Sequence, residues 1–366
     1  MSLPLPEPSP GGLLLEVTAN GICGTDLHFL SSVPSAPLVL GHEIVGRIVA
    51  FGPGHEHRDA DGEQLVEGDR IALFPWLPCR RCWGCQRFGP GATTCTNAFV
   101  YGIPPEAIGL PPLAGAIGDR CSPSLTGGFG RHVDVRPGTY MWRVPQEMAD
   151  TVASLLDPLA VAVRTVDVTR TPTGAWDEVL TPDSTAVVLG LGAVGLLTCI
   201  VLRQAGVGTV VASGARQARL AAARAVGVDL VLDTSETDAA VRRDAVLDVT
   251  QGRGADLLVD ATNSAAALRE GLGMVRRLGT VVEVGNIISD GTTVLLDPAR
   301  DVCQRNLRLL GVSFNPPRSY TEGMALLARG DLPFEALITR SRPFEEAMAA
   351  LDDLSGDVVK IVLTGP

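Results

Sequence analysis

The sequence predicts an α/β protein of two domains, in which a doubly wound parallel sheet is joined to a β-rich region. The chain has 366 residues, and at roughly 150 residues per domain this length suggests about two domains. From about residue 13 to residue 144, short apolar runs are broken by glycine and proline, as is typical of strands and irregular loops. From residue 184 onward, strand patterns alternate with alanine-rich helical patterns, which predicts a parallel sheet covered by helices.

Composition and charge exclude several classes of protein. Apolar residues make up 46% of the chain and charged residues 19%, which excludes a mainly disordered protein. The net charge of −11 argues against nucleic acid or an anionic membrane as the main partner. Lys360 is the sole lysine of the sequence, which argues against Schiff-base or pyridoxal-phosphate chemistry.

No secretory or membrane segment is expected. The first positive charge is Arg47, whereas a secretory signal begins with a basic region. Residues 185–202 form an uncharged run of 18 residues, which is long enough for a membrane span. Three glycines divide this run into a strand, a turn and a helix, so we expect a cytoplasmic protein.

The β-rich region begins after a proline-rich lead-in at residues 1–12. Strands are expected at residues 13–17, 44–50, 70–74 and 132–135, and an irregular excursion at 96–127. Asp157 followed by Pro158 predicts the start of a helix, because Asp is a good N-cap and proline suits the first helical position.

The alternating region follows. Its strands are expected at residues 185–190, 207–212, 228–232, 256–260, 279–285 and 307–313, with helices notably at 216–226 and 265–277. A helix at 344–354 and a strand at 358–363 close the chain.

A glycine-rich turn lies between the first strand and the first helix of the alternating region. Gly190 permits the tight turn, Gly192 lets the backbone approach a pyrophosphate, and Gly195 permits close packing of helix on strand. Ala193 and Val194 begin the helix, whose free N–H groups and positive dipole end suit a phosphate. The turn therefore predicts dinucleotide binding, with a merely structural glycine turn as the alternative.

The second strand of this region bears on the choice of coenzyme. An NAD site carries an acidic residue about 20 residues after the glycines, to bind the ribose. Here the chain reads Ala212-Ser-Gly-Ala-Arg216 without an acid, and Ser213 and Arg216 could hydrogen-bond a 2′-phosphate. The sequence therefore favours NADP(H) over NAD(H). Alternatively, Arg216 and Arg219 are solvated residues of a helix surface.

Four cysteines lie close together in the β-rich region. Cys79, Cys82, Cys85 and Cys95 supply four thiolates, which close a tetrahedron around a structural zinc ion. An iron–sulfur cluster is the main alternative, but the spacing lacks the bacterial cysteine pattern of such clusters.

A second set of candidate ligands is more dispersed. Cys23 lies in the segment GICGTDLH, and His42 lies in GHEIVG. With one further carboxylate or thiolate, these two side chains would leave a fourth zinc position open for substrate. Taken alone, each has a structural interpretation, because cysteine is often buried as an apolar residue and a histidine can be satisfied within a core.

The motifs together resemble those of the zinc-dependent medium-chain dehydrogenase/reductase family, which includes alcohol, polyol and threonine dehydrogenases. GICGTDLH, GHEIVG, the four cysteines and GLGAVG occur in this order, and the resemblance covers nearly the whole chain. It implies a GroES-like catalytic domain formed by residues 1–150 and 315–366, with a structural zinc lobe at 79–95. It also implies a Rossmann dinucleotide-binding domain at residues 151–314.

The resemblance implies roles for individual residues at the catalytic zinc. Cys23 and His42 match two zinc ligands, and Asp157 in Asp157-Pro-Leu matches the third, although an N-cap is its structural interpretation. Glu43 resembles an acid of the second coordination shell, which in this family sometimes reaches the metal itself.

Three further residues match family residues that orient a zinc ligand or carry the substrate proton. Asp26 matches the carboxylate that orients the zinc-bound histidine. Thr25 matches the hydroxyl that takes the substrate proton, and His28 the residue that passes it toward solvent. Gly285 and Val312, at late strand ends, are candidates for backbone contacts to the nicotinamide.

The resemblance implies a zinc- and nicotinamide-dependent oxidoreductase. Its substrates would be secondary alcohols or polyols, or the corresponding ketones or aldehydes. The alternatives are a zinc-free enone or quinone reductase of the same superfamily and a non-catalytic dinucleotide-binding relative. A homodimer or homotetramer is expected, formed through the apolar strand near residues 307–312.

Overall fold

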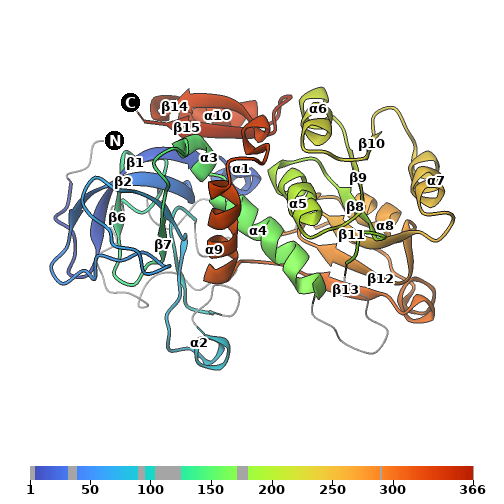
Figure 1. Cartoon of the computed structure of the whole chain (residues 1–366), viewed down its shortest axis with the longest axis horizontal. Helices are drawn as coiled ribbons and strands as arrows, with labels where there is room; N and C mark the ends of the chain where they lie inside the picture. Colours follow the sequence, from blue (N-terminus) through green and yellow to red (C-terminus); the bar gives the residue numbers. More distant parts are fainter. Residues whose placement is uncertain are drawn as a thin grey trace.

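The computed structural model describes residues 5–31, 39–89, 95–103, 125–170, 180–288 and 291–365. Most of the irregular excursion expected at 96–127, and the start of the proline-rich lead-in, lie outside these residues. Figure 1 shows two groups of strands side by side, with the long helices α4 (Leu156–Asp167) and α9 (Pro317–Ala328) between them.

The first group is a seven-stranded sheet that joins both ends of the chain. Its strand order is β14-β15-β1-β2-β3-β7, and β6 also pairs with β1. All of its pairings are antiparallel except that of β14 with β15. The strands are β1 (Leu13–Gly21), β2 (Glu43–Phe51), β3 (Arg70–Leu73), β6 (His132–Val135), β7 (Met141–Arg143), β14 (Ile338–Pro343) and β15 (Lys360–Thr364).

Short elements complete this part of the molecule. The helix α1 (Gly24–Ser31) follows β1 directly, and α3 (Asp150–Ala153) precedes α4. A separate two-stranded sheet, β4 (Trp76–Leu77) with β5 (Phe99–Val100), flanks the short helix α2 (Trp83–Phe88). The helix α10 (Ala347–Asp353) lies just before β15, where a longer helix at 344–354 was expected.

The second group is a six-stranded parallel sheet, which confirms the predicted fold class. Its order is β10-β9-β8-β11-β12-β13; an α-helix follows each of the first four strands in chain order, whereas the described residues between β12 and β13 form only the short helical turns at Pro298–Val302 and Cys303–Arg305. The strands are β8 (Thr185–Leu189), β9 (Thr209–Gly214), β10 (Leu230–Asp233), β11 (Ala255–Asp260), β12 (Val275–Glu283) and β13 (Arg308–Gly311). The helices are α5 (Ala193–Gln204), α6 (Gln217–Ala225), α7 (Ala239–Val249) and α8 (Ala265–Leu272).

Three local predictions are corrected by the structure. The strand expected at 207–212 begins at Thr209 and continues to Gly214, because it pairs with β8 as far as Ser213 and with β10 as far as Gly214. The helix expected at 265–277 ends at Leu272, where Gly273 is the C-cap and β12 begins two residues later. Asp157 is not an N-cap, since α4 begins at Leu156 with Leu155 as its N-cap.

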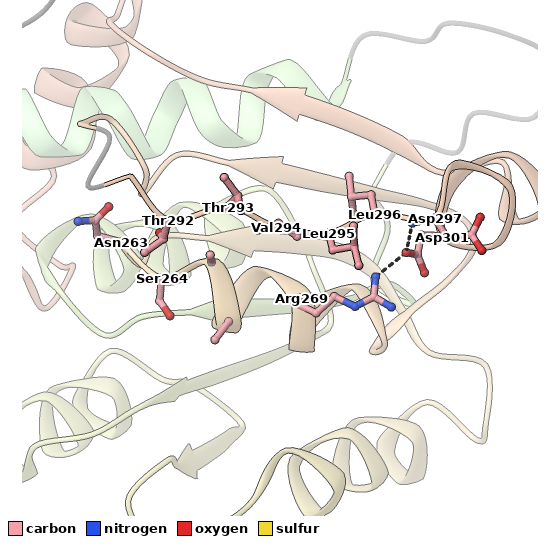
Figure 2. Close-up of a pocket in the computed structure, with 12 residues that line it drawn as sticks. Asn263, Ser264, Arg269, Thr292, Thr293, Val294, Leu295, Leu296, Asp297 and Asp301 are labelled. Atoms are coloured by element: carbon pink, nitrogen blue, oxygen red, sulfur yellow. Dashed lines mark hydrogen bonds and ion pairs between the residues drawn. The ribbon is translucent and has the colours of Figure 1, made fainter.

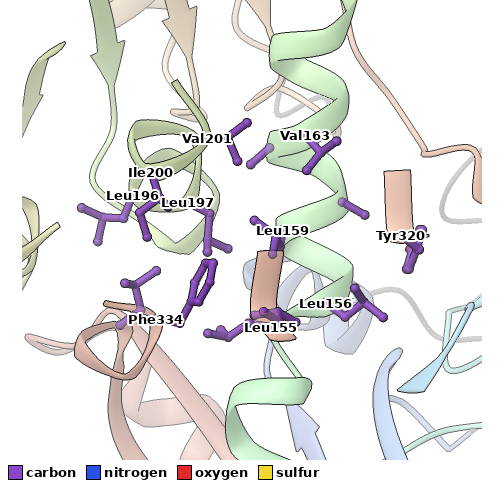
Figure 3. Packing of buried hydrophobic residues seen from close by; sticks show 14 of the residues in the cluster. Leu155, Leu156, Leu159, Val163, Leu196, Leu197, Ile200, Val201, Tyr320 and Phe334 are labelled. Atoms are coloured by element: carbon purple, nitrogen blue, oxygen red, sulfur yellow. The ribbon is translucent and has the colours of Figure 1, made fainter. Parts of the chain in front are cut away.

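A common apolar core joins the two sheets through α4. Figure 3 shows Leu159 and Val163 of α4 facing Leu197 and Val201 of α5, with Tyr320 of α9 on the other side of α4. This packing holds the end of α4 that carries Asp157 between the two sheets. The run at 185–202 forms β8, a turn and α5, and none of the helices in the described residues is long and apolar enough to cross a membrane.

Candidate active site

Cys23, His42 and Glu43 offer ligand atoms that all lie within 4.8 Å of one another. They meet because β1 and β2 are antiparallel neighbours, and Gly21 at the end of β1 pairs with Glu43 at the start of β2. Asp157 lines the same cavity as Cys23 and His42 but does not belong to this close set. A thiol, an imidazole and a carboxyl group suit a zinc ion.

Asp26 is fully buried beside these candidate ligands. One of its oxygens accepts the backbone N–H of Cys23 at 2.9 Å, and the other lies 3.5 Å from Nδ1 of His42. Burial disfavours the charged form of His42, but Asp26 and Cys23 outweigh it and hold the pKa of His42 well above its usual value. The surroundings of His42 therefore favour a positive charge, as a metal cation would supply.

Glu43 is engaged by the sole lysine of the chain. Both residues are only 2% exposed, and Nζ of Lys360 donates to Oε1 of Glu43 at 2.5 Å and to the carbonyl of Ile22 at 3.0 Å. Burial raises the pKa of Glu43, and Lys360 and His42 oppose that rise. Sequence reasoning missed this partner, although a lone lysine inside the apolar strand β15 was a usable signal.

Asp157 is held by a second residue that sequence reasoning missed. The hydroxyl of Tyr320 donates to Oδ1 of Asp157. Burial, together with the neighbouring Asp157, raises the pKa of Tyr320 well above its usual value, and a hydrogen bond with the side chain of Asn315 acts against that rise. The Tyr320 ring is stacked on Trp142, with centroids 5.2 Å apart, and meets Phe74 edge-on. This packing fixes the hydroxyl on one oxygen of Asp157.

A cavity of about 430 Å³ joins these groups to the end of the parallel sheet. Thr25 is half-buried and His28 exposed, and both line this cavity. Its other walls come from the parallel sheet and from apolar side chains, namely Val194, Gly285, Val312, Trp76, Ile103, Ile288 and Phe314. One cavity is therefore lined by both the candidate metal ligands and the candidate nicotinamide contacts.

The glycine turn has the geometry that a dinucleotide site needs. Gly190 has φ +94°, and a Cβ there would lie 2.9 Å from the carbonyl oxygen of Ala261. A Cβ at Gly195 would lie 1.9 Å from the carbonyl oxygen of Gly190. Gly192 is the N-cap of α5, and a Cβ there would meet nothing within 4 Å. The space above Gly192 and Ala193 can therefore admit a phosphate.

The two candidate contacts to a 2′-phosphate lie apart from that cavity. Ser213 is inside β9 and only 5% exposed. Arg216 is the N-cap of α6 with φ +71°, and its guanidinium donates to the carbonyls of Leu354 at 3.2 Å and Gly356 at 2.9 Å. Arg216 is exposed but bonded to the C-terminal segment, so it is more than a solvated helix residue.

The four clustered cysteines form the other candidate metal group, with ligand atoms within 4.8 Å of one another. The backbone N–H of Cys79 donates to Sγ of Cys95 at 3.2 Å. Hydrogen bonds from the backbone, first that of Cys85, lower the pKa of Cys82 to about 6, whereas burial and neighbouring thiols raise the pKa of Cys85 to about 12. Without a metal ion, the four thiols therefore resist becoming thiolates at the same time. A bound divalent cation would stabilise all four thiolates.

A second cavity of about 850 Å³ lies beside α8 (Figure 2). The segment 292–297 forms one wall, and Arg269 pairs with Asp301 at 2.5 Å. It shares Asn263 with the active-site cavity but contains none of the candidate metal ligands or predicted coenzyme contacts.

Comparison with known proteins identifies relatives along the whole chain. Family models described as zinc-binding dehydrogenase and alcohol dehydrogenase GroES-like domain match residues 193–329 and 9–146, and together cover more than half of the chain. Sorbitol dehydrogenase of Bacillus subtilis is 26% identical over 96% of this chain and 88% of its own length. The 5-exo-hydroxycamphor dehydrogenase of Pseudomonas putida is 28% identical over 99% of this chain and 94% of its own length.

Solved structures agree with this relationship. An alcohol dehydrogenase from Thermotoga maritima is 28% identical with a TM-score of 0.84, over 100% of this chain and 94% of its own. A zinc-binding dehydrogenase from Sinorhizobium meliloti, bound to NADP, is 27% identical with a TM-score of 0.79, over 99% of this chain and 94% of its own. The chain belongs to the zinc-dependent medium-chain dehydrogenase/reductase family and is an oxidoreductase of the alcohol dehydrogenase type.

Proposed function

We propose that this enzyme transfers hydride between a nicotinamide coenzyme and a secondary alcohol or polyol, or the corresponding ketone or aldehyde. The observation that carries the proposal is that one cavity is lined both by Cys23, His42 and Asp157 and by Gly285 and Val312. Relatives named sorbitol dehydrogenase and 5-exo-hydroxycamphor dehydrogenase support an alcohol substrate.

Cys23, His42 and Asp157 would hold the catalytic zinc, and the four clustered cysteines a structural zinc. Glu43 competes for the third position, but Lys360 neutralises it inside the protein. Asp157 gives one oxygen to Tyr320, which leaves the other for a metal. Zinc bound there acts as a Lewis acid that acidifies an alcohol or polarises a carbonyl group.

The proton is handled by residues of the same cavity. The half-buried hydroxyl of Thr25 takes the proton of the substrate hydroxyl, and exposed His28 relays it to solvent. Asp26 keeps His42 oriented by facing its Nδ1, which leaves Nε2 for the metal. The apolar walls, such as Trp76 and Phe314, exclude water from the reacting carbon.

The coenzyme would bind with its pyrophosphate at the glycine turn and its nicotinamide between Val194, Gly285 and Val312. The absence of an acid at the end of β9, together with Arg216, favours NADP(H) over NAD(H). We also propose the domain division 1–150 with 315–366 against 151–314, a cytoplasmic location, and a homodimer or homotetramer that pairs through the edge strand β13.

Metal analysis and a substrate screen test this function together. The purified protein should contain about two zinc ions per chain, and secondary alcohols or polyols should change the nicotinamide absorbance with at least one coenzyme. Full turnover by the metal-free protein would refute the zinc mechanism. A zinc-loaded protein that binds coenzyme but turns over none of these alcohols or carbonyl compounds would refute the substrate class.

A further inference from the structure

The first turn of α6 is bound to the C-terminal segment that leads into β15. The carboxylate oxygens of Asp357 lie 2.9 and 3.1 Å from the backbone nitrogen of Ala218. Nη1 of Arg216 donates to the carbonyls of Leu354 and Gly356, and Nε of Arg219 donates to the carbonyl of Val358 at 2.8 Å. Three residues at the start of α6, namely Arg216, Ala218 and Arg219, therefore bind residues 354–358, which are about 140 positions away in the sequence.

These contacts lie where the adenosine ribose of a coenzyme is expected. In a doubly wound sheet the ribose lies at the carboxyl end of the second strand, which here is β9, ending at Gly214. The helix α6 begins three residues later, and Arg219 lines the active-site cavity. Asp357 therefore brings a carboxylate to the region in which β9 itself lacks one.

The groups around Asp357, namely two arginines and a backbone N–H at the start of α6, are those that would bind a 2′-phosphate. Burial and Arg216 lower the pKa of Arg219, and Asp357 acts against that lowering. The carboxylate also meets a free N–H at the positive end of α6. A 2′-phosphate carries about two negative charges at neutral pH, so it would compete with Asp357 for the same N–H group and the same two arginines.

We propose that Asp357 is a coenzyme-discriminating residue that weakens the binding of NADP(H) relative to NAD(H). Its carboxylate repels a 2′-phosphate and occupies the Ala218 N–H, whereas it accepts a hydrogen bond from a free 2′-hydroxyl. Arg216 attracts the phosphate, so the two residues act in opposite directions on the coenzyme preference. The inference rests on the proposed nicotinamide coenzyme and names a residue that opposes the proposed preference for NADP(H).

The test compares Asp357→Asn with Asp352→Asn in the zinc-loaded protein. Asn keeps an oxygen for the Ala218 N–H but removes the charge, and Asp352 is an exposed acid of α10 on the same segment, so its variant has the same change in net charge. The dissociation constants of NADPH and NADH are measured by titration calorimetry at fixed ionic strength. Thermal unfolding of both variants checks that they fold.

We expect Asp357→Asn to tighten NADPH about tenfold, somewhat more than the roughly fivefold effect of one charge pair about 4 Å apart in bulk water. NADH should bind equally well or more weakly, and Asp352→Asn should leave both constants within about twofold. Unchanged NADPH binding, or equal tightening of both coenzymes, would overturn the role of Asp357 alone. Wild-type protein that binds neither coenzyme would instead overturn the proposed function.

Discussion

Tyr320→Phe removes one oxygen atom that touches the candidate metal site. The residue is fully buried, and its ring packs on Trp142 and Phe74, so phenylalanine should fill the same space. The lost hydroxyl donates to Asp157. A hydrogen bond to a charged group contributes about 1.5–3 kcal/mol, and at about 1.4 kcal/mol per factor of ten this corresponds to about a 10–100-fold loss, the range seen when an outer partner of a metal ligand is removed.

The assay is competition between the protein and a chromogenic zinc chelator, followed separately for the two zinc ions. We expect the catalytic zinc to bind about 10–100-fold more weakly in Tyr320→Phe, with the structural zinc unaffected. Tyr101→Phe is the control, because Tyr101 is also fully buried and its hydroxyl bonds Thr139 at 2.9 Å and the backbone N–H of Arg136 at 2.8 Å, neither of which is a candidate metal ligand. Unchanged affinity in Tyr320→Phe would refute Asp157 as the zinc ligand and favour Glu43.

Cys23→Ser should abolish turnover and lower the zinc content by one ion per chain, while the affinity for the coenzyme stays nearly unchanged. Metal analysis and coenzyme titration measure these two quantities, and retained turnover would contradict the ligand assignment. Lys360→Met should lower the free energy of unfolding by about 3–5 kcal/mol, because it leaves the buried Glu43 carboxylate unpaired. The double variant with Glu43→Gln should recover most of that loss in urea denaturation, and equal stability of the two variants would contradict the pairing. Burial, with Glu283, raises the pKa of Asp260 to about 7, above the value of about 3.9 for an unfolded chain. The native state then binds more protons between these values, so the contribution of Asp260 to stability is present below about pH 4 and is lost as the pH rises to 7. Asp260→Asn should therefore flatten the fall in stability between about pH 4 and pH 7, and parallel curves for the two proteins would refute this origin.

The local features of the chain were predictable from sequence. The glycine turn between β8 and α5 needs only its own residues, because the strand, the positive φ of Gly190 and the helix are all set within a dozen positions. The grouping of the four cysteines also follows from their spacing, since the first and last are only 16 positions apart. The parallel sheet followed from the alternation of strand and helix patterns.

Predictions that depended on tertiary contacts were less accurate. The extension of β9 to Gly214 depends on its partners β8 and β10, and the N-terminus of α4 depends on the preceding turn α3. The roles assigned to Cys23, His42 and Asp157 remain predictions, but the structure places all three around one cavity.

Local patterns in the sequence predicted the strands of the parallel sheet and its glycine turn, because these depend on apolar periodicity and on glycine and proline within a short window. Which side chains meet across the chain became clear from the folded structure alone. Lys360 reaches Glu43 over 317 positions, Tyr320 reaches Asp157 over 163, and Asp357 reaches Ala218 over 139. The physical reason is that the pairing of β15 with β1 and the packing of α9 on α4 arise from the burial of whole surfaces, which no local pattern encodes.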